Sequence, residues 1–205
     1  MTYFLYKIEH DYGLAPNPFH GYCTLAVCKS QIRNSSRLNI GDWVIGIGSK
    51  ALNNQNRIVF AMQVEEIIFF NDYWQDARFQ NKKPKVNGSL VQMYGDNFYH
   101  YDESSKKWIQ ENSAHSKENG KPNKNHLTRD VGGKKVLISQ TFYYFGENSI
   151  EIPEALFDKM NGEKLRNYKI LDSNIGSQFI QIVRNKYEIG IHGDPSSWSI
   201  HLKDD

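Results

Sequence analysis

The chain has 205 residues, of which 39% are hydrophobic and 13% aromatic, so it can bury a full core and is excluded from the disordered class. A formal net charge of only +2 excludes a molecule that is basic overall, although a local basic face is compatible with it. No stretch approaches the ~20 apolar residues of a spanning helix or forms the core of a signal peptide, so we expect a cytoplasmic protein.

The chain has two cysteines, Cys23 and Cys28, which are too few for a disulfide framework in a chain of this size. No second Cys/His pair lies nearby at zinc-site spacing. We therefore interpret both cysteines as small buried hydrophobic side chains, and we expect no metal site and no cofactor.

The N-terminal third predicts strands, a stiff loop and one helix. Residues 2–8 are rich in aromatic and β-branched side chains and predict a strand, which ends at the turn-rich stretch 10–18. Residues 23–34 carry helix formers with one apolar side and predict a short helix. Strands joined by a hairpin are predicted at 43–48 and 57–69, and the glycines inside the first of them indicate a bulge or a close approach of the backbone.

The rest of the chain alternates helical and strand-like patterns around a polar insert. Residues 71–79 begin with capping residues and predict one or two helical turns, whereas 87–130 is polar and turn-rich, typical of a functional or disordered loop. Residues 136–145 predict a strand that returns the chain to the sheet, and helices are predicted over 153–168 and 177–187. We expect one domain over 1–205, with the insert at 87–130 and a helical extension at 150–205.

Several motifs within the first 145 or so residues resemble a bacterial family called nucleotide modification associated domain 2. They lie at residues 15–29, 40–49, 59–64, 73–79, 83–84, 95–100 and 115–116. The resemblance implies an association with systems that modify DNA bases, and it names no reaction. The partners it implies are a modified nucleotide or DNA base, nucleic acid, and components of a DNA-modification or phage defence system. The last sixty residues match no motif of that family, and we interpret them as an extension.

A second resemblance concerns architecture. Residues 3–9, 41–50 and 58–66 follow the order and character of the EVE domain, which belongs with YTH and ASCH domains in the PUA superfamily. This resemblance implies an α+β fold, either a PUA-like curled β-barrel or a strongly bent mixed sheet with flanking helices. Several such domains hold a flipped or modified base between aromatic walls. The proline-rich first loop and the long insert depart from EVE.

A base pocket needs an aromatic slot, groups that read the base edge, and positive charge for a phosphate. The motifs above supply all three. The candidates for ligand binding are Tyr12, Asn17, His20, Lys29, Asp42, Trp43, Ser49, Lys50 and Asn97, with Tyr73, Trp74 and Arg33 as further stacking and phosphate contacts. Each has a structural alternative, because large aromatics fill cores, an Asp after Gly is a common turn residue and lysines are commonly solvated. For Asn17 the functional reading is favoured, since two prolines hold it in a preset orientation.

The catalytic candidates are Cys23, His20, His100, His115 and Asp96. A Cys/His pair supports nucleophilic catalysis and an Asp/His pair activates water, provided that the side chains meet in space. The sequence contains no nucleophile elbow, P-loop, zinc-deaminase motif or dinucleotide fingerprint.

Three functions therefore remain open. The leading hypothesis is a reader of modified bases, which predicts a deep aromatic pocket with a basic rim. The alternative is an enzyme of base or nucleotide modification, a glycosidic-bond hydrolase or group transferase, which predicts titratable groups that converge near Asn17. A scaffold in a modification or defence complex is the third.

Overall fold

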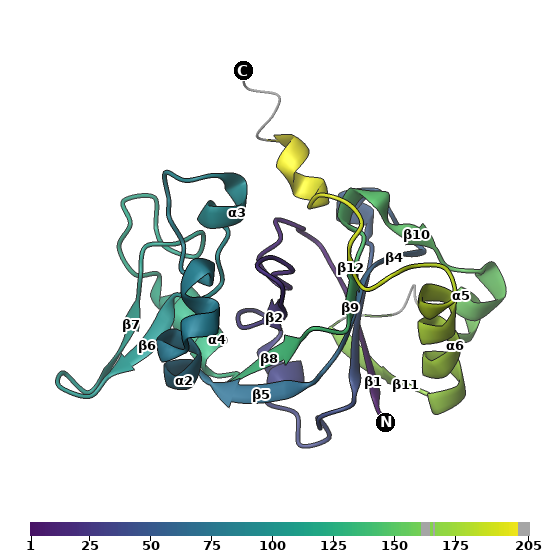
Figure 1. Ribbon diagram of the computed structural model, residues 1–205, viewed down its shortest axis with the longest axis horizontal. Coiled ribbons are helices and arrows are strands. Elements are labelled where there is room, and N and C mark those ends of the chain that lie inside the picture. The colour runs from purple at the N-terminus through teal and green to yellow at the C-terminus, as the bar shows by residue number, and fades with distance from the viewer. Residues whose placement is uncertain (161–164, 166, 201–205) are drawn as a thin grey trace. The chain divides into compact units, whose positions relative to one another are not determined.

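The computed structural model describes residues 1–160, 165 and 167–200 (Figure 1). The chain divides into two compact units. Unit 1 comprises Met1–Tyr12, Arg37–Glu65 and Ser139–Asp205, and unit 2 comprises Gly13–Ser36 and Glu66–Ile138. The chain of unit 1 is therefore interrupted twice by segments of unit 2.

Unit 1 is built on a mixed sheet of seven strands. Its order is β11-β1-β3-β4-β9-β12, and β10 pairs with β4. The strands are β1 (Tyr3–Lys7), β3 (Trp43–Ile47), β4 (Arg57–Gln63), β9 (Phe142–Tyr144), β10 (Ile150–Glu151), β11 (Tyr168–Leu171) and β12 (Gly190–Ile191). β1 runs parallel to β3 with Tyr3 opposite Trp43, and β3 pairs antiparallel with β4 through a register shift after Gly46. A Cβ on Gly46 would lie 2.3 Å from the ring of Phe60, so the predicted close approach is confirmed.

Two helices cover one face of this sheet, α5 (Glu154–Met160) and α6 (Ser173–Arg184) (Figure 1). Asp172 caps α6 by accepting a hydrogen bond from the backbone of Asn174. Phe179, Ile180 and Val183 recur at helical spacing and are buried in the core that α6 shares with the sheet. Unit 1 also holds the 3-10 helices η1 (Lys50–Leu52), η3 (Gly146–Asn148) and η5 (Ser196–Ile200).

Unit 2 is built around a three-stranded sheet and a separate hairpin. The sheet has the order β2-β8-β5, with Ile67 of β5 opposite Leu137 of β8. In the hairpin of β6 and β7, Tyr99 is opposite Gln110. The elements are β2 (Cys23–Leu25), α1 (Ser30–Arg33), β5 (Glu66–Phe69), α2 (Phe70–Gln75), η2 (Ala77–Lys82), α3 (Leu90–Met93), β6 (Tyr99–Asp102), β7 (Lys107–Gln110), α4 (Lys124–Val131) and β8 (Lys135–Ser139).

The helix expected over 23–34 is wrong. Strand β2 occupies its first three residues, and the helical part is confined to α1. Cys28 and Lys29 between them have positive φ values of 54° and 38°, which no right-handed helix accommodates. The disordered reading of 87–130 is also wrong, because α3, β6, β7 and α4 lie in this stretch.

Two further expectations near the C-terminus need correction. The single strand over 136–145 is two strands, β8 and β9, which belong to different sheets. The helix expected over 153–168 ends at Met160 as α5; residues 161–164 and 166 lie outside the described residues. Tyr168 begins β11, where it pairs with Tyr6 of β1, because aromatic and β-branched side chains fit a strand better than a helix end. The helix expected over 177–187 is found as α6, which begins earlier because Asp172 caps it.

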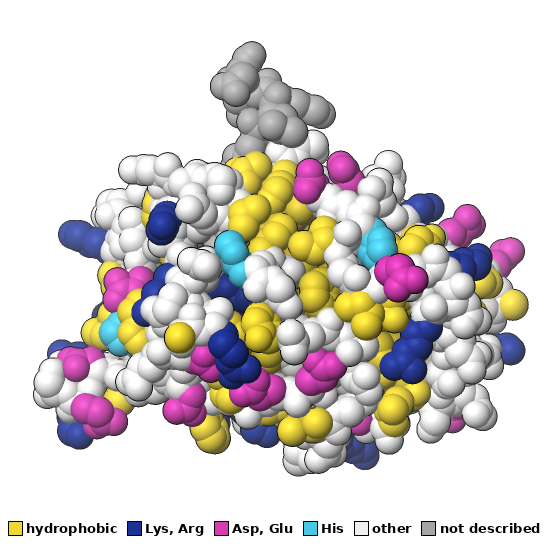
Figure 2. Space-filling view, in the orientation of Figure 1, with side chains coloured by type: hydrophobic (Ala, Val, Ile, Leu, Met, Phe, Trp, Pro, Cys, Tyr) yellow, Lys and Arg dark blue, Asp and Glu magenta, His cyan; other side chains and the backbone are white. Residues whose placement is uncertain are grey.

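The predicted α+β class is confirmed. The strands described here form open sheets and no closed barrel, so the curled barrel is not confirmed. No helix among the described residues is long and apolar enough to cross a membrane. On the face seen in Figure 2, Lys and Arg side chains are dispersed among Asp and Glu, in keeping with the small net charge.

Candidate active site

The ligand-binding candidates of unit 1 lie in turns and in the core. The Asp42 carboxylate accepts hydrogen bonds from the backbone amides of Thr2 at 2.6 Å and Asn39 at 2.9 Å, so it has the structural role of a turn residue. Trp43 is 1% exposed and belongs to the hydrophobic core, which corrects its assignment as a ligand wall. Tyr12 is half-buried, with its ring stacked on His10.

Two other candidates of unit 1, Ser49 and Lys50, lie at the start of η1. Lys50 is exposed, whereas Ser49 is buried and its Oγ has no hydrogen-bond partner among the described residues. The backbone amide of Ser49 is bound by the side chain of Asn54. No catalytic candidate from the sequence lies in unit 1.

In unit 2, the side-chain amide of Asn17 forms hydrogen bonds with other residues of the unit. The buried ammonium of Lys82 donates to Asn17 Oδ1 at 2.6 Å, to the carbonyl oxygen of Asn17 at 3.0 Å and to that of Tyr22 at 2.9 Å. Asn17 Nδ2 donates to the carbonyl oxygen of Tyr94. Burial lowers the pKa of Lys82 to about 8, although the charge of Asp96 acts to raise it. The expectation that Asn17 presents its amide to a ligand is therefore wrong: the amide helps to satisfy a buried cation.

Titratable groups do converge near Asn17, but they are buried and bind other side chains of unit 2 instead of a substrate. Asp96 is 1% exposed and accepts hydrogen bonds from the hydroxyls of Tyr73 at 2.6 Å and Thr24 at 2.7 Å. Cys23 is fully buried, and burial raises the pKa of its thiol far above the ordinary value. Neither Asp96 nor Cys23 is open to a substrate, which corrects both catalytic assignments.

Asn97 and the two stacking candidates of unit 2 also make internal contacts. Asn97 is buried, its Nδ2 donates to the carbonyl oxygens of Tyr73 and Phe79, and its Oδ1 has no hydrogen-bond partner among the described residues. Tyr73 itself is fully buried. Trp74 stacks on the ring of His100 with centroids 4.3 Å apart.

The histidine candidates have different environments. His100 Nε2 lies 2.9 Å from Glu111 Oε1 at the surface of the hairpin. His20 is exposed, and partial burial together with Lys82 lowers its pKa. His115 is 9% exposed and contacts a cysteine and a carboxylate. Of the proposed catalytic residues, only His115 has the surroundings that nucleophilic catalysis requires.

The partners of His115 are Cys28 and Asp130. We call the three residues Cys28, His115 and Asp130 the Cys28 triad. His115 Nε2 lies 3.9 Å from Cys28 Sγ, and His115 Nδ1 lies 2.7 Å from Asp130 Oδ2. The imidazole thus bridges a thiol and a carboxylate through its two nitrogens. Cys28 is half-buried and Asp130 fully buried. A nucleophile next to a base, with the base oriented by a third group, is the arrangement of a catalytic triad.

The backbone around Cys28 is held in a strained conformation. Cys28 and Lys29 form the turn between β2 and α1, and both are non-glycine residues in the left-handed region. Such strain persists only where surrounding contacts fix it, and it is concentrated at functional sites. The contacts here come from Arg33, which is 0% exposed, and whose guanidinium donates to the carbonyl oxygens of Cys28 at 2.9 Å, Asp130 at 2.7 Å and Lys135 at 2.8 Å. Arg33, a phosphate contact in the sequence-based prediction, instead connects the backbones of the nucleophile and the carboxylate.

The Asp130 carboxylate is surrounded by donors. It accepts from the amide of Cys28 at 3.0 Å, from the hydroxyl of Tyr99 at 3.0 Å and from Arg129 Nε at 2.9 Å, in addition to its contact with His115. Burial alone would raise the pKa of Asp130, but the hydrogen bonds from His115 and Arg129 hold it well below its usual range. Asp130 is therefore a carboxylate at neutral pH.

His115 gains a proton from this environment. Burial acts to lower its pKa, and the hydrogen bonds to Asp130 and Cys28 outweigh burial and raise the pKa to about 9. At neutral pH both ring nitrogens then carry hydrogen, and Nε2 faces the sulfur as a donor. Nearby, His126 Nδ1 lies 3.1 Å from the carbonyl oxygen of His115.

The same three residues offer one sulfur, one nitrogen and one oxygen atom within 4.8 Å of one another, which is close enough for the atoms to share a metal ion. Both oxygens of Asp130 are already engaged, and the guanidinium of Arg129 lies against Oδ1 and 3.8 Å from Cys28 Sγ. A metal ion would have to displace these donors and stand beside a fixed positive charge. The donor set fits a hydrogen-bonded triad better than a metal centre.

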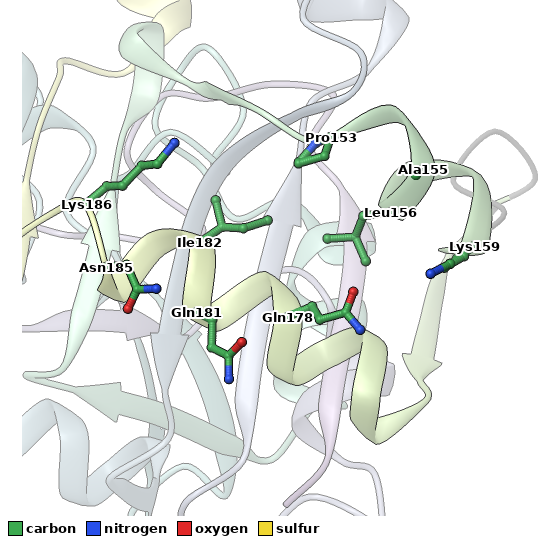
Figure 3. Close-up of a pocket in the computed structure, with 9 residues that line it drawn as sticks. All are labelled: Pro153, Ala155, Leu156, Lys159, Gln178, Gln181, Ile182, Asn185 and Lys186. Atoms are coloured by element: carbon green, nitrogen blue, oxygen red, sulfur yellow. The ribbon is translucent and has the colours of Figure 1, made fainter.

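Unit 1 contains a separate groove between α5 and α6, with a volume of about 430 Å³ (Figure 3). Figure 3 shows the apolar side chains of Leu156 and Ile182 between the two helices, with the amide of Gln178 beside them. The nine residues that line it include two lysines and no acid, histidine, cysteine or hydroxyl side chain. The groove therefore lacks the groups for acid–base or nucleophilic chemistry.

Sequence reasoning found His115 and missed Cys28 and Asp130. The signal at Cys28 is its place at the junction of a β-rich run and a helix, which the wrong helix prediction concealed. The signal at Asp130 is an acid in the last turn of α4, where the helix dipole disfavours a negative charge.

The Cys28 triad places a thiol, an imidazole and a carboxylate in contact with one another inside unit 2 of this α+β chain. The chain belongs to the family of nucleotide modification associated domain 2, whose model matches residues 1–202. The match extends through most of the last sixty residues, to residue 202, so the expectation that they are an extension beyond the family is wrong. No curated protein and no solved structure matches the chain.

Proposed function

We propose that unit 2 is a thiol-dependent enzyme that removes or transfers an acyl group on a nucleotide or nucleic-acid base. The observation that carries this proposal is the position of His115 between Cys28 Sγ at 3.9 Å and Asp130 Oδ2 at 2.7 Å. A triad of this kind acts on electrophilic carbon, and carbonyl carbon is its usual target. The family's association with nucleotide modification supports a nucleotide or base as the other part of the substrate.

In the proposed reaction the thiolate form of Cys28, which is the nucleophilic form of a cysteine, attacks the carbonyl carbon, so that a C–S bond forms and the carbonyl oxygen takes the electron pair. As this intermediate collapses, the C–N or C–O bond to the nucleotide breaks, and His115 Nε2 gives its proton to the leaving atom. Water then attacks the thioester and gives a proton to His115, the C–S bond breaks, and a carboxylic acid leaves. An amine in place of water makes the enzyme a group transferase.

The other residues have positioning roles in this proposal. Asp130 orients the imidazole through Nδ1 and stabilises its positive charge, and Arg33 fixes the backbones of Cys28 and Asp130 relative to each other. Of the two enzyme classes considered from the sequence, group transfer is favoured over glycosidic-bond hydrolysis, which uses a pair of carboxylates.

The reader and scaffold hypotheses have less support. A reader needs polar groups open to a base edge, whereas Asn17 and Asn97 are each 1% exposed and their Nδ2 groups donate to carbonyl oxygens inside unit 2. Its link to DNA, to modified bases or to a defence system rests on the family's association alone. A scaffold has no use for a buried histidine held between a thiol and a carboxylate.

The first test measures alkylation of the two cysteines by iodoacetamide at pH 7, with peptide mass spectrometry to assign each site. Cys28 is expected to react at least about tenfold faster than glutathione, because the imidazole of His115 lies 3.9 Å from its sulfur, whereas the buried Cys23 stays unmodified. His115→Gln is expected to remove most of this advantage, and His100→Gln serves as the matched control. A Cys28 that reacts no faster than glutathione, with no effect of His115→Gln, would sink the proposal.

Turnover is then sought with nucleosides acylated on an exocyclic amine, alongside Cys28→Ser. Trapping of an acyl group on Cys28, seen as a mass increase that Cys28→Ser abolishes, would establish the covalent step.

A further inference from the structure

We propose that Arg129 makes the Cys28 site selective for substrates that carry an anionic oxygen group, a carboxylate or a phosphate, next to the carbon that is attacked. This inference rests on the proposed function, because it assigns a substrate class to the same site. It is carried by the position of one half-exposed guanidinium beside the sulfur.

Arg129 is fixed by the triad's own carboxylate. Its Nε donates to Asp130 Oδ1 at 2.9 Å, and its Nη2 lies 3.3 Å from Asp130 Oδ2 and 3.8 Å from Cys28 Sγ. The guanidinium is planar and rigid, so these contacts set the direction of its remaining donors. Nη1 has no hydrogen-bond partner among the described residues, and the side chain is 45% exposed. The two N–H groups of Nη1 are thus available to a substrate, on the same guanidinium whose Nη2 lies 3.8 Å from Cys28 Sγ.

The charges around the sulfur point to the same class of substrate. The carboxylate of Asp130 faces three cationic groups, namely His115, Arg129 and the buried Arg33, so positive charge is left uncompensated beside Cys28 Sγ. The neighbouring His126 responds to this potential: burial and the charges of His115 and Arg129 lower its pKa. An anionic substrate group restores the balance.

The experiment compares two alkylating agents of nearly equal size, anionic iodoacetate and neutral iodoacetamide. In both reactions the C–S bond to Cys28 forms and the C–I bond breaks with release of iodide, so the ratio of rates reports charge selectivity. Changing Arg129→Gln is expected to lower the iodoacetate to iodoacetamide ratio about fivefold, the size expected for a partly solvated charge ~4 Å away. Arg129→Lys is expected to keep most of the ratio. Lys124→Gln removes an exposed charge from the other end of the same helix and is the matched control.

A ratio that is unchanged in Arg129→Gln, while wild-type Cys28 reacts rapidly with iodoacetamide, overturns the role of Arg129 and leaves the proposed enzyme intact. A wild-type Cys28 that is slow with iodoacetamide overturns the proposed function, and this inference with it. If Arg129→Gln does not fold, the wild-type protein decides: the ratio must fall toward that of glutathione at 0.5 M salt, and a salt-independent ratio equal to that of glutathione refutes the proposal.

The source of the anion is distinguished by protection of wild-type Cys28 from iodoacetamide. Slower alkylation with adenosine monophosphate or inorganic phosphate, and not with adenosine or acetate, supports a phosphate. Slower alkylation with acetate or succinate alone supports a carboxylate on the acyl group. Equal protection by adenosine and its monophosphate, together with none by the simple anions, counts against the proposal.

Discussion

Replacing His115 with Gln is expected to make the stability of unit 2 less dependent on pH. The pKa of His115 is about 9 in the folded protein and 6.5 is the ordinary value of the unfolded chain, so the folded state binds this proton more tightly. The stabilisation is therefore complete below pH 6.5 and is lost as the pH rises through about 9. Its size is about 3 kcal/mol, from 1.36 kcal/mol per pKa unit. The side chain is 11% exposed, so solvent screening reduces this value little.

Urea unfolding of the wild type and of His115→Gln, followed by circular dichroism at pH values from 6 to 10, measures this effect. The difference in the free energy of unfolding is expected to be largest at pH 6 and to fall by about 3 kcal/mol by pH 10. In the background of Asp130→Asn, which removes the carboxylate that holds the proton, the pH dependence of the difference is expected to shrink strongly. A difference that is constant from pH 6 to 10, or that grows with pH, would refute the assignment of a protonated His115.

Three further outcomes test the buried polar contacts of unit 2. Cys28→Ser is expected to lower the pKa of His115 toward 6.5, because the hydrogen bond and charge of Cys28 help to raise it; NMR titration of the imidazole measures the change. Arg33→Met is expected to destabilise the protein by about 3 kcal/mol in urea unfolding, since three buried carbonyl oxygens lose their donor. Lys82→Met is expected to cost ~2–4 kcal/mol in the same assay and Lys83→Met, at the surface, less than ~1 kcal/mol; equal effects would contradict the assigned role of Lys82.

The strands of unit 1 could be predicted because their sequence pattern is local. Residues 2–8, 43–48 and 57–69 combine β-branched and aromatic side chains with turn residues at their ends, and β1, β3 and β4 lie within those ranges. The single strand predicted over 57–69 is nevertheless two strands, β4 and β5, which belong to different sheets. The helix predicted over 23–34 is wrong because this prediction, too, relied on local sequence alone. Helix propensity is averaged over neighbouring residues, and it does not register that Cys28 and Lys29 adopt left-handed conformations, with the Cys28 amide bound by the side chain of the distant Asp130.

The candidate site was less predictable because it depends on contacts between distant residues. His115 meets Cys28, 87 positions away, and residue type gives no indication of which of two cysteines it will meet. Asn17 shows the converse difficulty. An amide held in a preset orientation can serve a ligand or an internal cation, and here it binds Lys82.

The charged groups around Asp130 are difficult to explain as devices for stability. The free energy that a buried ion pair loses when its charges leave water is scarcely offset by their mutual attraction. Apolar side chains of the same volume commonly stabilise a fold as well or better. Asp130 also stands in the last turn of α4, where the helix dipole opposes its charge. Its carboxylate nevertheless accepts hydrogen bonds from Cys28, Tyr99 and Arg129 and orients His115. This costly arrangement ends at a half-buried thiol on a strained turn, and a chemical role for Cys28 accounts for both features, whereas a stabilising role accounts for neither.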